Sequence, residues 1–199
     1  RPNAADGGAP RLTIARSWRV DLGKCVDAAP ILVCMASVGG FGSQVTAGDA
    51  HELLCLVGSH AGRICAVGFE DGKVRWSSQL PDRIEAACCV VSIAAPPRFD
   101  ATRNASETVV LIGSHDEHMH ALRLSDGQRV WSRRARGIYK AAARPLPGYS
   151  GVAMSACFGG EIAALDASSG RTIWRCLCDA PIFATPLAVP PAIFRPCRL

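Results

Sequence analysis

The sequence has few aromatic residues, few charges and no long apolar run. Aromatic residues make up 6% of the 199 positions and charged residues 20%, whereas hydrophobic residues make up 49%. This balance is typical of a globular chain and excludes an intrinsically disordered one. No apolar stretch reaches the roughly 18 to 20 residues that a transmembrane helix needs, and residues 1–10 are polar and rich in Gly, Ala and Pro, unlike a secretory signal. We therefore expect a cytoplasmic protein without membrane contact.

The ten cysteines do not indicate a disulfide framework. A reduced cysteine inside an apolar run packs as a small hydrophobic side chain, and a chain without a secretory signal is expected to keep its thiols reduced. The cysteines that lie in such runs are Cys34, Cys55, Cys65, Cys88, Cys89 and Cys157.

Four tryptophans mark an internal repeat. Trp18, Trp76, Trp131 and Trp174 are separated by 58, 55 and 43 residues. The shortest spacing matches the roughly 40 to 45 residues of a four-stranded propeller blade. The two longer repeats carry insertions rich in Gly, Pro, Ser and Asn at residues 37–50 and 94–107.

A second pattern surrounds three of these tryptophans, with Ala six residues before a Gly and Trp four residues after it. A Gly between two short strands indicates a tight hairpin, because Gly adopts positive φ without strain. Asp166 stands two residues after the Ala of the third copy, whereas Gly68 and Arg123 occupy that position in the others, where we expect weaker bracing of the turn. The repeat residues are Ala66, Gly72, Trp76, Ala121, Gly127, Trp131, Ala164, Gly170 and Trp174.

A third register follows each tryptophan by nine to twelve residues. One position of variable character precedes a run of small residues, which suits a strand packed near a crowded axis. The four copies are Asp27-Ala28-Ala29-Pro30, Glu85-Ala86-Ala87-Cys88, Lys140-Ala141-Ala142-Ala143 and Phe183-Ala184-Thr185-Pro186.

These registers predict an all-β fold, a partial β-propeller of about three four-stranded antiparallel blades. The ring is expected to be incomplete, because a closed propeller needs about four to eight blades. We expect a linker at 1–11, a partial propeller at 12–189 with blades near 27–80, 85–135 and 140–178 and the start of a fourth at 180–189, and an irregular tail at 190–199. The expected strands are 29–35, 53–57, 64–69 and 74–79, then 87–93, 108–112, 119–124 and 129–133, then 142–145, 152–157, 162–166 and 172–177.

The third copy, Ala-x-Asp-x-x-x-Gly-x-x-x-Trp at residues 164–174, resembles the tryptophan-docking motif of PQQ-type (quinoprotein alcohol dehydrogenase-like) propellers. The resemblance implies that each Trp packs against the adjacent blade and that the Asp and Gly shape the hairpin. The strings at residues 23–28, 82–85 and 113–118 resemble the C-terminal propeller of the animal acyl-CoA synthetase family of β-alanine-activating, 2-aminoadipic 6-semialdehyde dehydrogenase-like enzymes. This resemblance extends over roughly residues 12–189.

The family resemblance implies an acid-thiol ligase whose adenylation and carrier domains precede the propeller. Neither a Gly-rich phosphate loop nor a carrier-type Ser motif occurs in the 199 residues, so we expect a non-catalytic scaffold module. Its expected partners are other proteins or the other domains of the parent enzyme.

The alternative is a fragment of a quinone-dependent dehydrogenase. Such propellers bind PQQ at the axis with Ca²⁺ and an Asp base, and a vicinal Cys pair like Cys88-Cys89 covers the ring in some of them. No acidic cluster here suits Ca²⁺, so we expect no cofactor.

The segment from His115 to His120 contains three histidines within six residues. His118 and His120 would share a strand face, because side chains alternate with period two. His115, His118 and His120 are therefore candidate metal ligands. The segment aligns with the hairpin around His60, however, which favours a solvated turn.

Basic residues cluster after the second repeat. On one rim they would bind acidic protein or RNA, but they lack interleaved aromatic residues apart from Tyr139, so we expect no nucleic-acid partner. We assign no catalytic residue, because no nucleophile elbow accompanies the histidines. The basic residues are Arg133, Arg134, Arg136, Lys140 and Arg144.

Overall fold

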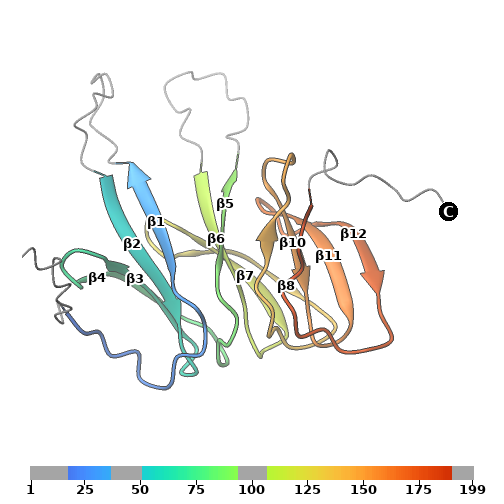
Figure 1. Ribbon diagram of the computed structural model, residues 1–199, viewed down its shortest axis with the longest axis horizontal. Coiled ribbons are helices and arrows are strands. Elements are labelled where there is room, and N and C mark those ends of the chain that lie inside the picture. The colour runs from blue at the N-terminus through green and yellow to red at the C-terminus, as the bar shows by residue number, and fades with distance from the viewer. Residues whose placement is uncertain (1–17, 37–50, 94–106, 190–199) are drawn as a thin grey trace, which may run out of the picture.

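The computed structural model describes residues 18–36, 51–93 and 107–189, so the expected linker and tail lie outside the described residues. Within these ranges the chain forms three four-stranded antiparallel sheets in which each strand pairs with its sequence neighbours (Figure 1). Runs of Val, Ile, Leu and Cys bounded by Gly form the strands, as such runs favour buried sheets. None of the described segments contains a helix long and apolar enough to cross a membrane.

Each sheet is one blade. The first contains β1 (Ile31–Ala36), β2 (His51–Gly58), β3 (Arg63–Gly68) and β4 (Val74–Gln79). The second contains β5 (Cys89–Ile93), β6 (Glu107–Gly113), β7 (His118–Arg123) and β8 (Arg129–Arg134). The third contains β9 (Arg144–Pro145), β10 (Val152–Ala156), β11 (Glu161–Asp166) and β12 (Thr172–Leu177).

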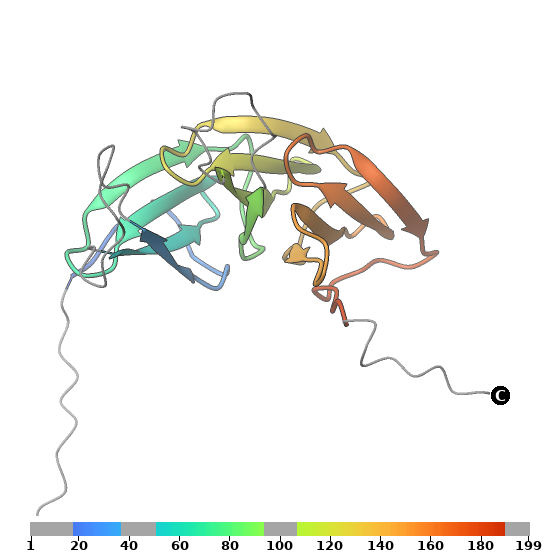
Figure 2. The ribbon, with the colours of Figure 1, turned by 90° about the horizontal axis from the view of Figure 1, so that it is seen from above.

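The three blades fan out as an arc (Figure 2). The first strands β1, β5 and β9 lie toward the concave side, and the last strands β4, β8 and β12 lie toward the convex side. The blades do not close a ring within the described ranges. The prediction of an all-β, incomplete propeller with three four-stranded blades is thus confirmed.

Apolar side chains fill the spaces between the blades, because alternate residues of each strand face opposite sides of its sheet. The core between the first and second blades includes Leu56, Ile64, Trp76, Val110 and Leu122. The core between the second and third includes Val109, Leu111, Met119, Ala163 and Leu165. A third cluster, Leu22, Cys65 and Val67 with Trp18 and Val20, covers the outer face of the first blade.

Three tryptophans each join one segment of the chain to the hairpin of the next blade. The indole Nε1 of Trp76 donates to the carbonyl oxygen of Leu124 over 2.7 Å. Trp131 donates in the same way to Ala167 over 2.9 Å. Trp18, which precedes the first blade, donates to Phe69 over 2.7 Å. The same bond therefore repeats at every described junction between successive units.

A glycine makes room for each docked ring. Gly72, Gly127 and Gly170 have φ of +67°, +73° and +73°, which a side chain would strain. A Cβ on Gly72 would lie 2.5 Å from Cβ of Trp18, and one on Gly170 would lie 2.7 Å from Cε3 of Trp131. A Cβ on Gly127 would overlap the ring of Trp76 in the same way. The glycine is required both by the turn and by the approach of the indole.

The Ala of the repeat lies directly across the sheet from the Trp. Ala66 pairs with Trp76, and a register shift follows immediately. The second and third blades repeat this pairing and this shift at Ala121 and Ala164. All three alanines are fully buried. Their small side chains leave space for the indole, which explains why the spacing recurs in all three blades.

A carboxylate braces all three hairpins, although it comes from different positions. Asp166 Oδ1 accepts from the backbone N–H groups of Ser168 and Ser169, and its hydrogen bonds to Ser168 lower the pKa of this carboxyl. Asp71 and Asp126, which lie inside the turns of the other two blades, accept from the N–H groups of Lys73 and Gln128. The expectation of weaker bracing in these blades therefore overlooked a shift of the carboxylate by a few residues.

Trp174 lacks the environment of the other three tryptophans. It occupies the same register on β12, opposite Ala164, but its side chain is 44% exposed, whereas Trp76 is 8% exposed. Its indole has no hydrogen bond to any described residue, because no hairpin of a following blade is present in those ranges.

We predict that Trp76→Ala lowers the free energy of unfolding by about 3 to 5 kcal/mol, because it empties a buried site between two blades. Trp174→Ala is the matched control and should cost less than about 1 kcal/mol, since its side chain is exposed and no following hairpin covers it in the described ranges. Urea unfolding of both variants measures the difference. Equal losses would contradict the docking scheme.

A second prediction concerns the hairpin glycines. Gly127→Ala should destabilise by about 1 to 3 kcal/mol more than Gly148→Ala, because both have positive φ but only the first Cβ meets a ring. A Cβ on Gly148 would have no neighbouring atom within 4 Å, so this position isolates the backbone cost. Thermal unfolding of the two variants tests this, and indistinguishable midpoints would argue against a close Gly127–Trp76 contact.

Candidate functional site

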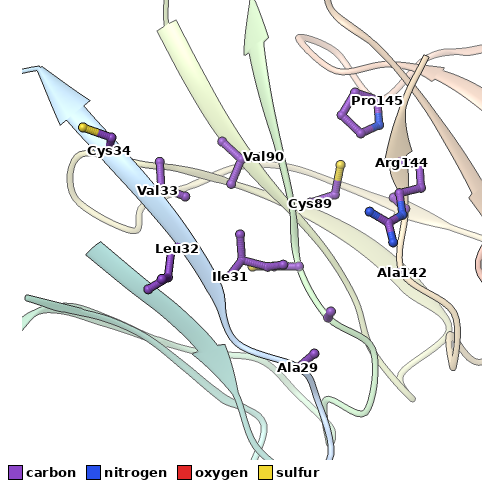
Figure 3. Close-up of a pocket in the computed structure, with 13 residues that line it drawn as sticks. Ala29, Ile31, Leu32, Val33, Cys34, Cys89, Val90, Ala142, Arg144 and Pro145 are labelled. Atoms are coloured by element: carbon purple, nitrogen blue, oxygen red, sulfur yellow. The ribbon is translucent and has the colours of Figure 1, made fainter. Parts of the chain in front are cut away.

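The concave side of the arc holds a groove of about 460 Å³ between the first strands of the blades. Ile31 and Val90 lie along it on β1 and β5, and Arg144 and Pro145 lie on β9 (Figure 3). The small residues that precede these strands, Ala29, Ala87 and Ala142, also line it. The groove is therefore mainly apolar, with one charged side chain among its lining residues.

The adjacent cysteines of the second blade point to opposite sides. Cys88 packs in the core between the first and second blades, and Cys89 packs in the core between the second and third. Both are free thiols, and burial raises the pKa of each to about 12. Both also line the groove, but because they point to different blade interfaces they do not present a vicinal pair over one ligand.

The groove does not fit a quinone cofactor with its calcium ion. Ca²⁺ takes six to eight oxygen ligands, mostly from carboxylates and carbonyls. Among the described residues that line the groove there is no Asp, Glu, Asn or Gln. No step of quinone chemistry can be derived from these side chains.

The three candidate histidines do not converge. The ring centroids of His118 and His120 are 5.9 Å apart, and both contact Asp116, whose Oδ2 lies 2.9 Å from His120 Nε2. Burial lowers the pKa of His120. His115 turns away toward Glu85. Within the described ranges, these three side chains do not bring their ligand atoms within 4.8 Å of one another.

A charged cluster instead forms at the connection between the first and second blades. Glu85 Oε2 lies 3.1 Å from His115 Nε2 and 3.4 Å from Lys140 Nζ, and Glu85 Oε1 lies 3.2 Å from Arg83 Nε. Burial opposes the ionised carboxylate, but His115 and Lys140 outweigh it and lower the pKa of Glu85. Arg83 Nε also donates to His115 Nδ1 over 3.0 Å, which leaves the proton of a neutral imidazole on Nε2, facing Glu85.

Sequence reasoning missed this cluster, although its signal was present. Glu85 and Lys140 occupy the variable position before the small residues, which the repeat places next to one another on successive blades. The sequence pattern predicted crowding after this position, whereas the structure also pairs Glu85 with Lys140 across two successive blades.

The basic residues after the second repeat do not form one patch. Arg133 pairs with Glu161 over 2.7 Å, Arg134 pairs with Glu117 over 2.9 Å, and Lys140 joins Glu85. Arg144 lies apart from them in the concave groove. Carboxylates thus neutralise most of this charge locally.

Comparison with known proteins identifies the repeat. The family model described as outer membrane protein assembly factor BamB matches residues 13–181. The β-alanine-activating enzyme of Homo sapiens is 37% identical over 83 residues, which is 42% of this chain and 7% of that protein. The enzyme of Mus musculus is 36% identical over the same shares. The chain thus spans less than a tenth of the length of the curated relatives it matches.

Solved structures show the same fold at low sequence identity. The crystal structure of BamB from Moraxella catarrhalis has a TM-score of 0.53 and 17% identity, covering 80% of this chain and 40% of that chain. The structure of BBS1N in complex with ARL6DN, soaked with lead, has a TM-score of 0.53 and 12% identity, covering 86% of this chain and 45% of that chain. Since the family match extends over most of the 199 residues, the chain belongs to the BamB-like family of PQQ-type β-propeller repeats.

Proposed function

We propose that this chain is a non-catalytic scaffold module whose exposed third blade binds a further PQQ-type repeat. The observation that carries the proposal is Trp174, which stands in the docking register of Trp76 and Trp131 but has no hairpin to receive it in the described ranges. Exposed apolar groups of this size mark interaction surfaces.

The edge around Trp174 supports the proposal. Five large apolar side chains are exposed on β12 and on the segment that follows it, namely Ile173, Trp174, Leu177, Phe183 and Leu187. Trp174 lies at the position that corresponds to Trp76 of the first blade, where the second blade covers the ring. The partner that fits Trp174 is a hairpin of a further repeat, with a glycine under the indole ring and a backbone carbonyl that accepts the indole N–H.

The chain after β12 contacts the connection that precedes the first strand of the third blade. The hydroxyl oxygen of Thr185 accepts from the N–H of Ala142, the residue at the same repeat position one blade earlier. This bond supports the proposal that residues 180–189 start a fourth unit beside the third.

The similarity to β-alanine-activating enzymes suggests the setting of this module. We propose that it serves an acyl-adenylating enzyme as a docking site for protein, either another domain or a partner, while the ligase reaction resides elsewhere. The cysteines within the described residues are free thiols, which supports the proposal of a cytoplasmic location.

An appended repeat tests the docking edge. A chain that runs to Val189 and continues with a copy of residues 147–178 supplies a hairpin with its own glycine. We predict that its free energy of unfolding exceeds that of the chain ending at Val189 by at least about 2 kcal/mol, because the Trp174 ring becomes buried. Trp174 fluorescence should shift to shorter wavelength.

The matched control replaces the glycine of the appended hairpin, equivalent to Gly170, with Val. This variant should lose the gain in stability, because its side chain occupies the space of the ring. An appended repeat that leaves both fluorescence and stability unchanged would refute the docking edge.

A direct assay tests the absence of catalysis. We expect ATP–pyrophosphate exchange with β-alanine to stay at background for the 199-residue chain, and dye reduction with added PQQ and Ca²⁺ to do the same. Activity above background in either assay, lost on heat denaturation, would contradict a scaffold role.

A further inference from the structure

Three side chains of different ligand types meet beside the first blade. Cys25 and Asp27 lie on the connection before β1, and His60 lies in the turn between β2 and β3. Their sulfur, carboxylate oxygen and imidazole nitrogen all lie within 4.8 Å of one another. His60 Nε2 is 2.9 Å from Asp27 Oδ2.

Hydrogen bonds hold the two segments together without using these ligand atoms. The backbone N–H of His60 donates to the carbonyl oxygen of Cys25 over 2.9 Å. The hydroxyl of Ser59 donates to the carbonyl oxygen of Leu22 over 2.9 Å. The three side chains are therefore brought together by the fold rather than by their own contacts.

The second blade has the same construction with one difference. Arg83, Glu85 and His115 occupy the positions of Cys25, Asp27 and His60, and the N–H of His115 donates to the carbonyl of Arg83 over 3.0 Å. There the guanidinium contacts both the carboxylate and the imidazole. In the second blade, the Arg83 guanidinium thus supplies a positive charge beside the carboxylate and the imidazole.

The first blade has a thiol where the second has a guanidinium. In the part of the chain that the structure describes, Asp27 pairs with no Lys or Arg, and its charged contact is His60. His60 Nε2 is buried and, like the equivalent His115 Nε2, makes no aligned hydrogen bond, although it lies 2.9 Å from Asp27 Oδ2. A carboxylate, an imidazole nitrogen and a thiol here surround the position that a cation fills one blade later.

We propose that Cys25, Asp27 and His60 bind a Zn²⁺-class metal ion. A thiolate beside an imidazole selects zinc or cobalt over magnesium and calcium, which prefer oxygen ligands alone. Glu85 stays paired with Arg83, His115 and Lys140, so water completes the coordination of the ion. The ion then ties the N-terminal connection to the turn between β2 and β3 of the first blade.

Metal titration of the full 199-residue chain tests the site. After removal of bound metal with EDTA, Zn²⁺ added in a calorimeter should bind at this site, and Co²⁺ should give a thiolate-to-cobalt absorption band. Cys25→Ser and His60→Gln should weaken Zn²⁺ binding by about tenfold or more, since even outer-shell changes cost this much. His115→Gln and Cys178→Ser, which alter an equivalent histidine and another exposed thiol, should leave the affinity unchanged.

Cys25→Arg separates metal binding from folding. It introduces the guanidinium of the second blade, so it should abolish the rise of the melting temperature that Zn²⁺ causes in the wild type while leaving the metal-free protein as stable. Asp27→Asn, with folding checked by circular dichroism, provides a second variant that should bind weakly. Zn²⁺ affinity unchanged in His60→Gln, a cobalt spectrum without the thiolate band, or no binding in the wild type would overturn the proposal.

Discussion

The docking of an indole on the hairpin of the next blade is the interaction on which this structure depends. A tryptophan N–H reaches a backbone carbonyl, a glycine lies under the ring, and an alanine across the sheet leaves space beside it. A four-stranded sheet buries little on its own, so its stability comes from the faces that successive blades cover for one another. The docked indole fixes how these faces meet, and the third blade, whose Trp174 has no receiving hairpin in the described ranges, exposes apolar side chains.

A second set of repeated positions lies on the connections between blades, and it holds polar and charged side chains instead of core residues. The same backbone bond holds each connection to the turn between the second and third strands of the blade that follows it, at His60, His115 and Phe158. Because that geometry repeats, side chains at equivalent positions become neighbours and are free to differ: thiol and carboxylate at the first, guanidinium and carboxylate at the second. The repeated Trp, Gly and Ala positions therefore determine how the blades pack, whereas the connections between blades carry the charged and thiol side chains.

The strands could be predicted closely because the Trp, Gly and Ala positions are local to each hairpin and fix its turn and register. The direction of Cys88 and Cys89 could not, because a position in an apolar run does not reveal which of two packed faces it serves. The charged cluster around Glu85 also escaped prediction, since its members are far apart in the sequence and meet only through stacking of blades. The turn carboxylates were missed because Asp71 and Asp126 brace their hairpins from a different position than Asp166.

The claim that docked tryptophans hold the three blades in an arc is tested most directly by hydrogen exchange at the four indole N–H groups, monitored by nuclear magnetic resonance. Slow exchange is expected for Trp76, Trp131 and Trp18, whose N–H groups donate to carbonyls, and fast exchange for Trp174. Equal protection of Trp174 and Trp76 would contradict an open last blade, and fast exchange at Trp76 would contradict the docking itself.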